Sequence, residues 1–296
     1  MLKKLTYILY KILHFFDSIL KKIFNRSFLV HLKDLIEKDS YAIKLINDKK
    51  IVFFTPNAIS KWRINSLFQK EPETIDWIDS FDQSKKIIFW DIGANIGIYS
   101  VYAATKFNDI EVVSFEPSTS NLRILSRNIS INDLDNKIKI NQFPLIDKEN
   151  QYLTMNEGEF VEGWSMNTFG QSTDFKGEKF LARNKYKIFG TSIDYILKNK
   201  FLKIPNYIKI DVDGIEHLIL KGGVNFLKDD TLKSISIELN ENYQSQYKEV
   251  LNILKNSNFI LKHKKRASEF YNLEKFDRVY NFVFEKKKLI NKLYYL

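Results

Sequence analysis

The stretch Asp91-Ile-Gly-Ala-Asn-Ile-Gly97 follows directly after the apolar run Ile87-Ile-Phe-Trp90 and precedes the amphipathic run Ile98–Lys106. A short buried strand that breaks into glycines and resumes as a helix is typical of the nucleotide-binding unit of α/β proteins. Glycine is suited to such a loop because the backbone there approaches a ligand closely or takes up a positive φ. The sequence therefore predicts a strand, a loop and a helix that bind a nucleoside-containing ligand.

Two acidic residues indicate which nucleoside this is. Asp91 stands where a pyrophosphate would be repelled but a cation attracted, and S-adenosylmethionine (SAM) carries a sulfonium and an ammonium group and no phosphate. Glu116 ends the next predicted strand, Glu111–Phe115, where a carboxylate can accept hydrogen bonds from both ribose hydroxyls of an adenosine. NAD uses the same ribose contact but prefers a third glycine and no acid before the loop. The pattern therefore favours SAM over NAD, and SAM as the ligand predicts a methyltransferase.

We expect the residues that bind SAM to come from the glycine loop and from the end of the second strand. They are Asp91, Gly93, Ala94, Asn95, Gly97, Glu116 and Pro117.

A second group of ionisable residues follows the predicted strand Tyr207–Ile210. Asp211, Asp213, Glu216 and His217 fall within seven residues. Ligands of an open α/β sheet bind beyond the carboxyl ends of its strands, so these side chains should face the same crevice as the glycine loop. Acids here can also stabilise the N-terminus of the next helix, which would account for one or two of them. We expect these four catalytic candidates to include the base that takes a proton from the acceptor.

The composition narrows the chemistry further. The chain has 296 residues and no cysteine, which excludes disulfides, zinc–thiolate sites and cysteine nucleophiles. Cytosine-C5 methylation and radical SAM chemistry, which need cysteine, are excluded with them.

The formal net charge is +10, but the basic clusters lie at the two ends of the chain and not around the expected site, so a nucleic-acid partner is not favoured. The sequence also predicts no transmembrane span and no cleavable signal peptide.

The N-terminal part of the chain divides into two predicted units. Residues 1–25 repeat apolar side chains at helical spacing with lysines on the opposite face, which predicts a basic amphipathic helix. Such a helix lies on an anionic membrane surface, or it packs on the body of the protein or on a partner helix. Residues 26–80 are expected to form an extension with a helix over His31–Asn47 and a strand around Ile51–Phe54.

The third predicted unit, residues 81–296, is the SAM-dependent methyltransferase domain, in which strands and helices alternate from Ile87 onward. Residues 144–189 interrupt this alternation and lack a clean periodicity. We interpret them as an insertion that could wall the substrate site.

Three motifs make the chain resemble the FkbM family of SAM-dependent methyltransferases: Asp91–Ser100, the strand end Phe115-Glu-Pro117, and Ile208–Glu216. The resemblance covers residues 50–285. It implies an α/β class I methyltransferase fold, which is Rossmann-like, with a seven-stranded, mostly parallel sheet, a reversed final strand and helices on both faces, here with a helical N-terminal extension. The position of Asp213 is usually glutamate in the family, so the carboxylate is one methylene shorter here.

The resemblance also implies O-methylation of a hydroxyl, with sugars of surface glycans and polyketide-type hydroxyls as acceptors. We expect a cytoplasmic enzyme that methylates a sugar of a surface glycan or of its lipid-linked precursor, with residues 1–25 as a contact to the inner face of the membrane. One alternative is Mg²⁺-dependent O-methylation of a small molecule, with Asp211, Glu238 and Asn240 as a less favoured set of metal ligands. Another is a SAM-binding scaffold without catalytic activity.

Overall fold

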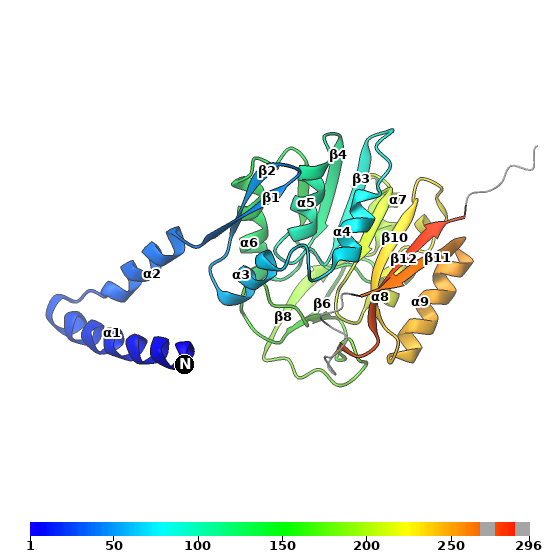
Figure 1. The fold of residues 1–296 in the computed structure, drawn as a ribbon. Helices are drawn as coiled ribbons and strands as arrows, with labels where there is room; N and C mark the ends of the chain where they lie inside the picture. The colour runs from blue at the N-terminus through cyan, green and yellow to red at the C-terminus, as the bar shows by residue number, and fades with distance from the viewer. Residues whose placement is uncertain (267–275, 288–296) are drawn as a thin grey trace, which may run out of the picture.

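A seven-stranded sheet with helices on both faces forms the centre of the computed structural model, which describes residues 1–266 and 276–287 (Figure 1). The strand order is β11-β12-β10-β9-β3-β4-β5. Their bounds are β3 (Ile87–Ile92), β4 (Ile110–Phe115), β5 (Ile138–Asn141), β9 (Tyr207–Ile210), β10 (Ser234–Asn240), β11 (Phe259–Lys265) and β12 (Val279–Lys286). Residues 267–275 and 288–296 of the expected methyltransferase domain lie outside the described residues.

Helices cover the two faces of the sheet, and the strands are apolar on both sides for that reason. Phe89 and Trp90 are adjacent in β3 and therefore point to opposite faces. Phe89 joins one hydrophobic core and Trp90 joins another. The first core packs on α4 (Pro72–Asp79), α5 (Ile98–Lys106) and α6 (Thr119–Ser130). The second packs on α7 (Ile193–Lys198), α8 (Glu216–Lys221), the short 3₁₀ helix Phe226–Lys228 and α9 (Gln244–Asn256). This arrangement confirms the expected fold class.

The final strand is reversed, as the family resemblance implied. β12 pairs antiparallel with both β10 and β11, whereas β3, β4, β5, β9 and β10 pair in parallel. All carboxyl ends of the parallel strands therefore meet at one edge of the sheet.

The predicted helix over residues 31–47 is wrong beyond Lys38. Helix α2 (Phe28–Lys38) ends there, and β1 (Tyr41–Ile46) pairs with β2 (Lys49–Phe54) as an antiparallel hairpin. Asn47 and Asp48 both have positive φ, 50° and 61°, which is the conformation that a two-residue hairpin turn requires.

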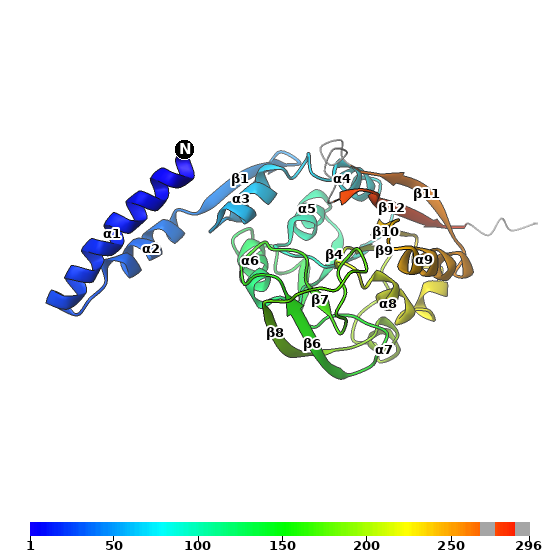
Figure 2. The ribbon, with the colours of Figure 1, turned by 90° about the horizontal axis from the view of Figure 1, so that it is seen from below.

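Most of the N-terminal extension shares the core of the sheet. Phe53 of β2, Ile64 of α3 (Ala58–Asn65) and Trp77 of α4 belong to the same hydrophobic cluster as Phe89. Helix α1 (Leu2–Phe24) and α2 instead extend away from the sheet (Figures 1 and 2). In the part of the chain that the structure describes, no helix has the length and hydropathy of a membrane span.

The insertion forms a small sheet of its own. Strand β6 (Gln151–Glu157) pairs antiparallel with β7 (Thr168–Phe169) on one side and with β8 (Asn184–Gly190) on the other. The loop between β6 and β7, residues 158–167, reaches over the edge of the main sheet; we call it the strap.

Candidate active site

The loop between β3 and α5 is shaped by two glycines. Gly93 has a φ of +82°, and a Cβ there would lie 1.9 Å from the carbonyl oxygen of Asp211 at the end of β9. Gly97 has a φ of +83°, and a Cβ there would lie 2.4 Å from Cδ1 of Leu125 in α6. The positive φ favours glycine at both positions, and at Gly93 the backbone of Asp211 also leaves no room for a side chain.

Asp91 lies beneath this loop and is fully buried. Its Oδ2 accepts a 2.6 Å hydrogen bond from Oγ of Ser100, which in turn lies 2.7 Å from Oγ of Ser114. Burial raises the pKa of Asp91, and the nearby charge of Lys209 opposes the rise. The structure thus gives Asp91 a supporting place under the loop, and its expected contact with SAM stays a prediction.

Glu116 follows β4 directly and has a buried carboxylate. Its Oε2 accepts a 2.7 Å hydrogen bond from the backbone N–H of Asn95, and its Oε1 accepts a 2.8 Å hydrogen bond from that of Ser118. Burial raises the pKa of Glu116 to about 7, although these hydrogen bonds oppose the rise. Each carboxylate oxygen has further acceptor capacity, so Glu116 can still accept from a pair of hydroxyl groups.

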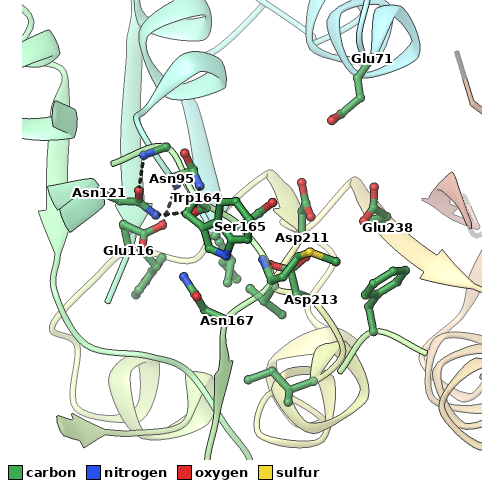
Figure 3. Close-up of a pocket in the computed structure, with 18 of the residues that line it drawn as sticks. Glu71, Asn95, Glu116, Asn121, Trp164, Ser165, Asn167, Asp211, Asp213 and Glu238 are labelled. Carbon is green, nitrogen blue, oxygen red and sulfur yellow. Dashed lines mark hydrogen bonds between the residues drawn. The ribbon is translucent and has the colours of Figure 1, made fainter. Parts of the chain in front are cut away.

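A cavity of about 470 Å³ lies at the carboxyl ends of the parallel strands (Figure 3), and this volume is in the usual range of small-molecule sites. Four of the residues expected to bind SAM line it: Gly93, Asn95, Glu116 and Pro117. Three are not among the lining residues: Asp91, Ala94 and Gly97.

The strap closes the Glu116 end of the cavity. The carbonyl oxygen of Trp164 accepts hydrogen bonds from the side-chain amides of Asn95, at 2.9 Å, and Asn121, at 3.2 Å. Oδ1 of Asn121 accepts a 2.8 Å hydrogen bond from the N–H of Gly163. Figure 3 shows Trp164 between this amide cluster and the acidic residues beyond it.

The other end of the cavity is acidic. Glu71, Asp211 and Glu238 each bring a carboxylate oxygen within 4.8 Å of the other two. Nζ of the buried Lys209 lies 2.9 Å from Oδ2 of Asp211, and Lys70 forms an ion pair with Glu71. Each of these two carboxylates therefore has a lysine as its counter-ion.

Glu238 differs from its two neighbours because its carboxylate has no hydrogen bond or ion pair with any of the described residues, although its backbone is paired within β10. Burial and the charges of Asp211 and Glu71 raise its pKa well above the usual value. The cluster therefore holds a proton most readily on Glu238.

The same three carboxylates form an all-oxygen set of the kind that Mg²⁺ prefers. Asn240, which belongs to the expected set of ligands, is not part of this group; its amide is buried and donates to the carbonyl of Phe175 at 3.2 Å. Glu71, which lies far away in the sequence, takes that place.

The sequence model of the methyltransferase FkbM domain matches residues 91–261, more than half of the chain. The chain belongs to the FkbM methyltransferase family. The match confirms the resemblance and the presence of a methyltransferase domain.

Individual relatives are distant. Methyltransferase sdnD from Sordaria araneosa is 24% identical over 154 residues, which are 45% of this chain and 58% of that protein, so the chain spans little more than half of this relative. Among solved structures, methyltransferase FkbM from Methylobacillus flagellatus KT shares 16% identity, with a TM-score of 0.45 over 70% of this chain and 45% of that one. Precorrin-6y C5,15-methyltransferase from Geobacter metallireducens GS-15 shares 11%, with a TM-score of 0.41 over 72% and 87%.

SAM, the cofactor of this FkbM fold, fits the Glu116 end of the cavity. The carboxylate of Glu116 lines this end and has acceptor capacity of the kind that ribose hydroxyls require. Nε1 of Trp164 is buried without a hydrogen-bond partner in the described residues, so a donor is also available beside it. An adenosine has both kinds of partner, because its hydroxyls donate and its ring nitrogens accept.

The four catalytic candidates of this FkbM-family chain have different surroundings. Asp211 and Asp213 line the cavity, whereas Glu216 and His217 are not among the lining residues. Oδ2 of Asp213 accepts a 2.6 Å hydrogen bond from the N–H of Met166 and so holds the strap. Burial raises the pKa of Asp213 to about 6, and the charge of Asp211 adds to the rise.

Glu216 and His217 are the first two residues of α8, and their side chains face α9. Oε1 of Glu216 accepts from the N–H groups of Val212 and Gly214, at 3.3 and 3.2 Å, and its Oε2 accepts from the amide of Gln246 at 2.7 Å. Nδ1 of His217 lies 3.5 Å from the same amide nitrogen.

Several lining residues were not among our candidates for the site. Glu71, Asn121 and Trp164 reach the cavity from three separate segments, and Glu238 was considered only as a metal ligand. A signal existed for Glu238, because it stands near the end of a predicted strand. Trp164 lies in the insertion that was expected to wall the substrate site, whereas the contacts of Glu71 and Asn121 with the cavity arise only from the tertiary fold.

Proposed function

We propose that the chain is a SAM-dependent O-methyltransferase whose acceptor is a sugar hydroxyl of a surface glycan or of its lipid-linked precursor. The observation that carries this proposal is the division of one cavity into two ends. One end has Glu116 and the glycine loop, and the other has the carboxylates of Asp211, Asp213 and Glu238.

The acidic end favours a neutral, hydroxyl-rich acceptor. Carboxylates accept hydrogen bonds from hydroxyl groups, whereas they repel a phosphate or carboxylate placed beside them. Aromatic side chains, among them Trp62, Phe175 and Tyr280, also line the cavity and offer apolar surface to the C–H face of a sugar ring. The same charges disfavour a nucleic-acid backbone at this end.

Bound SAM supplies an electrophilic methyl group on its sulfonium. The protein must then align the acceptor oxygen with that methyl group and remove the hydroxyl proton as the new bond forms. Asp211 is the best-placed base, because its carboxylate lines the cavity, with Nζ of Lys209 as a counter-ion at 2.9 Å. Glu238, in its protonated form, can hold a neighbouring hydroxyl of the acceptor by a hydrogen bond.

A Mg²⁺-dependent reaction is the second candidate, and the close approach of Glu71, Asp211 and Glu238 favours it. In that case these three residues would hold the cation, which would lower the pKa of the acceptor hydroxyl. Lys70 and Lys209 would have to release two of the three carboxylates first, and that makes the metal-free reaction our preferred one.

The test is to measure conversion of SAM to S-adenosylhomocysteine with neutral sugars, uronic acids, sugar phosphates and amines as acceptors, each with and without EDTA. We expect turnover with neutral sugars that EDTA does not reduce. Loss of turnover in EDTA with recovery on adding Mg²⁺ would establish the second candidate instead. Turnover with amines or anionic acceptors alone would contradict both, and SAM binding without turnover of any acceptor would support a scaffold.

A further inference from the structure

The helical hairpin of α1 and α2, residues 2–38, extends away from the catalytic domain (Figures 1 and 2). Asp17 of α1 is buried and fixes the turn. It accepts hydrogen bonds from Oγ of Ser27 at 2.8 Å and from the N–H of Leu29 at 3.1 Å. Leu13 and Leu20, four residues before and three after Asp17, are half-buried on the same side of α1. This side of α1 therefore faces α2.

The apolar face of α1 adjoins the side that faces α2 and is itself exposed. Its members recur at spacings of three and four residues and form one stripe along the helix. All of them are at least 39% exposed: Leu2, Leu5, Ile8, Leu9, Ile12, Phe15, Phe16, Ile19 and Ile23. A continuous apolar stripe of this length on a protein surface indicates an interaction site.

The charge of the hairpin indicates what covers this stripe. Helix α1 has five lysines, at positions 3, 4, 11, 21 and 22, and they lie on the opposite face or along its margins. Asp17 is its only acid, and this carboxylate is already occupied by Ser27, Leu29 and an ion pair with Lys21. A second copy seated on the stripe would bring the lysines along its margins next to those of the first copy, and these like charges would repel each other. An anionic lipid surface would attract the lysines while its acyl region accepts the apolar stripe.

We infer that residues 2–38 form a peripheral membrane-docking hairpin, with the stripe of α1 buried at the interface of an anionic bilayer. The inference does not depend on the reaction proposed above. The hairpin is also connected to the cavity wall. Glu37 at the end of α2 accepts a 2.5 Å hydrogen bond from Arg123 of α6, and the same guanidinium donates to Glu162 of the strap at 3.0 Å. Docking would therefore set the position of the active site relative to the bilayer.

The test uses the full chain with vesicles of phosphatidylcholine alone and of phosphatidylcholine mixed with phosphatidylglycerol, separated by sedimentation. We expect binding to the anionic vesicles that weakens as salt is added. The triple substitution Ile12→Gln, Phe16→Gln and Ile19→Gln should reduce this binding on the order of a hundredfold, because three apolar side chains no longer enter the lipid. These side chains are exposed, so the melting temperature should not change.

The matched control is Leu181→Gln, which removes an apolar side chain that is 78% exposed on the catalytic domain. It should leave vesicle binding as it is. Lys4→Glu with Lys11→Glu should remove the preference for anionic vesicles, since each lysine near such a surface contributes about fivefold to partitioning. Indifference of the full chain to anionic vesicles would overturn the inference. So would equal binding by the triple variant, or a dimer in the absence of lipid that the triple variant converts to a monomer.

Discussion

Glu116 is the residue on which binding of the adenosine part of SAM should depend most. We expect Glu116→Gln to weaken SAM binding by about 1.5–3 kcal/mol, the usual value of a hydrogen bond to a charged group. Isothermal titration calorimetry measures this directly. Glu111→Gln is the control, because Glu111 belongs to the same strand but pairs with Lys139 outside the cavity. Equal affinity of wild type and Glu116→Gln would contradict the assignment.

The wild type and Glu116→Gln should also differ in how their affinity for SAM depends on pH. Burial raises the pKa of Glu116 to about 7, so the carboxylate that accepts the ribose hydroxyls is mostly protonated at pH 6 and mostly ionised at pH 8. We expect SAM affinity of the wild type to rise about tenfold between these two values. The rise should be absent in Glu116→Gln.

Asp211 should matter for the reaction and not for SAM binding. Asp211→Asn keeps the size of the side chain but removes the proton acceptor, so turnover should fall by about two or more orders of magnitude while SAM affinity stays within a small factor. Initial rates of S-adenosylhomocysteine formation and calorimetry give the two numbers. Glu238→Gln serves as the comparison, since an amide can still hold an acceptor hydroxyl and a smaller loss is expected. If Asp211→Asn keeps near-normal turnover, Asp211 is not the base.

At the scale of an element, the turn between β9 and α8 is held by one buried carboxyl group. Burial raises the pKa of Glu216 to about 7, above the usual 4.5. The folded state therefore binds this proton more tightly than the unfolded chain does. Its contribution to stability is fully present below pH 4.5 and is lost as the pH rises through 7.

Glu216→Gln should remove this pH dependence. The difference in unfolding free energy between the variant and the wild type should shift in favour of the variant by up to about 3 kcal/mol between pH 4.5 and 8. Urea unfolding at a series of pH values measures it. A constant difference across this range would mean that Glu216 does not titrate as the buried turn requires.

Elements that depend on near neighbours in sequence could be predicted, and those that depend on distant contacts could not. The path from Asp91 to Gly97 was predictable because strand, glycines and helix follow one another directly. The sequence pattern of residues 41–46 is compatible with either a helix or a strand. Their pairing with β2, which begins with Tyr41 opposite Phe54, makes them a strand. The hydrogen bonds between Asn121 and the strap join residues 42 and 43 positions apart in the sequence, and no local sequence pattern predicts them.

At the scale of the whole molecule, the hairpin should be separable from the rest. Its described side-chain ties to the catalytic domain are the contacts of Glu37 with Arg123 and Arg127, and partly exposed ion pairs contribute about 0–1 kcal/mol each. Deleting residues 1–38 should therefore lower the unfolding free energy by less than about 2 kcal/mol and leave SAM affinity unchanged.

Thermal unfolding and calorimetry of the truncated chain measure both quantities. Deletion of residues 1–25 is the control, because it keeps Glu37 in place. An unfolded or aggregated product of either deletion would show that the hairpin is part of the folding unit.

The position of β12 has a consequence for how the protein is made. It lies between β10 and β11, yet residues 279–286 leave the ribosome after every other strand of this sheet. Until then β11 has no partner in the sheet, and the nascent chain presents unpaired strand edges of the kind that associate with other chains. The sheet can therefore be completed only after the C-terminal part of the chain has been synthesised. A chain that stalls or is cleaved before residue 279 should be a client for chaperones and proteases, even though both its predicted cofactor loop and the carboxylates of its cavity have already been translated.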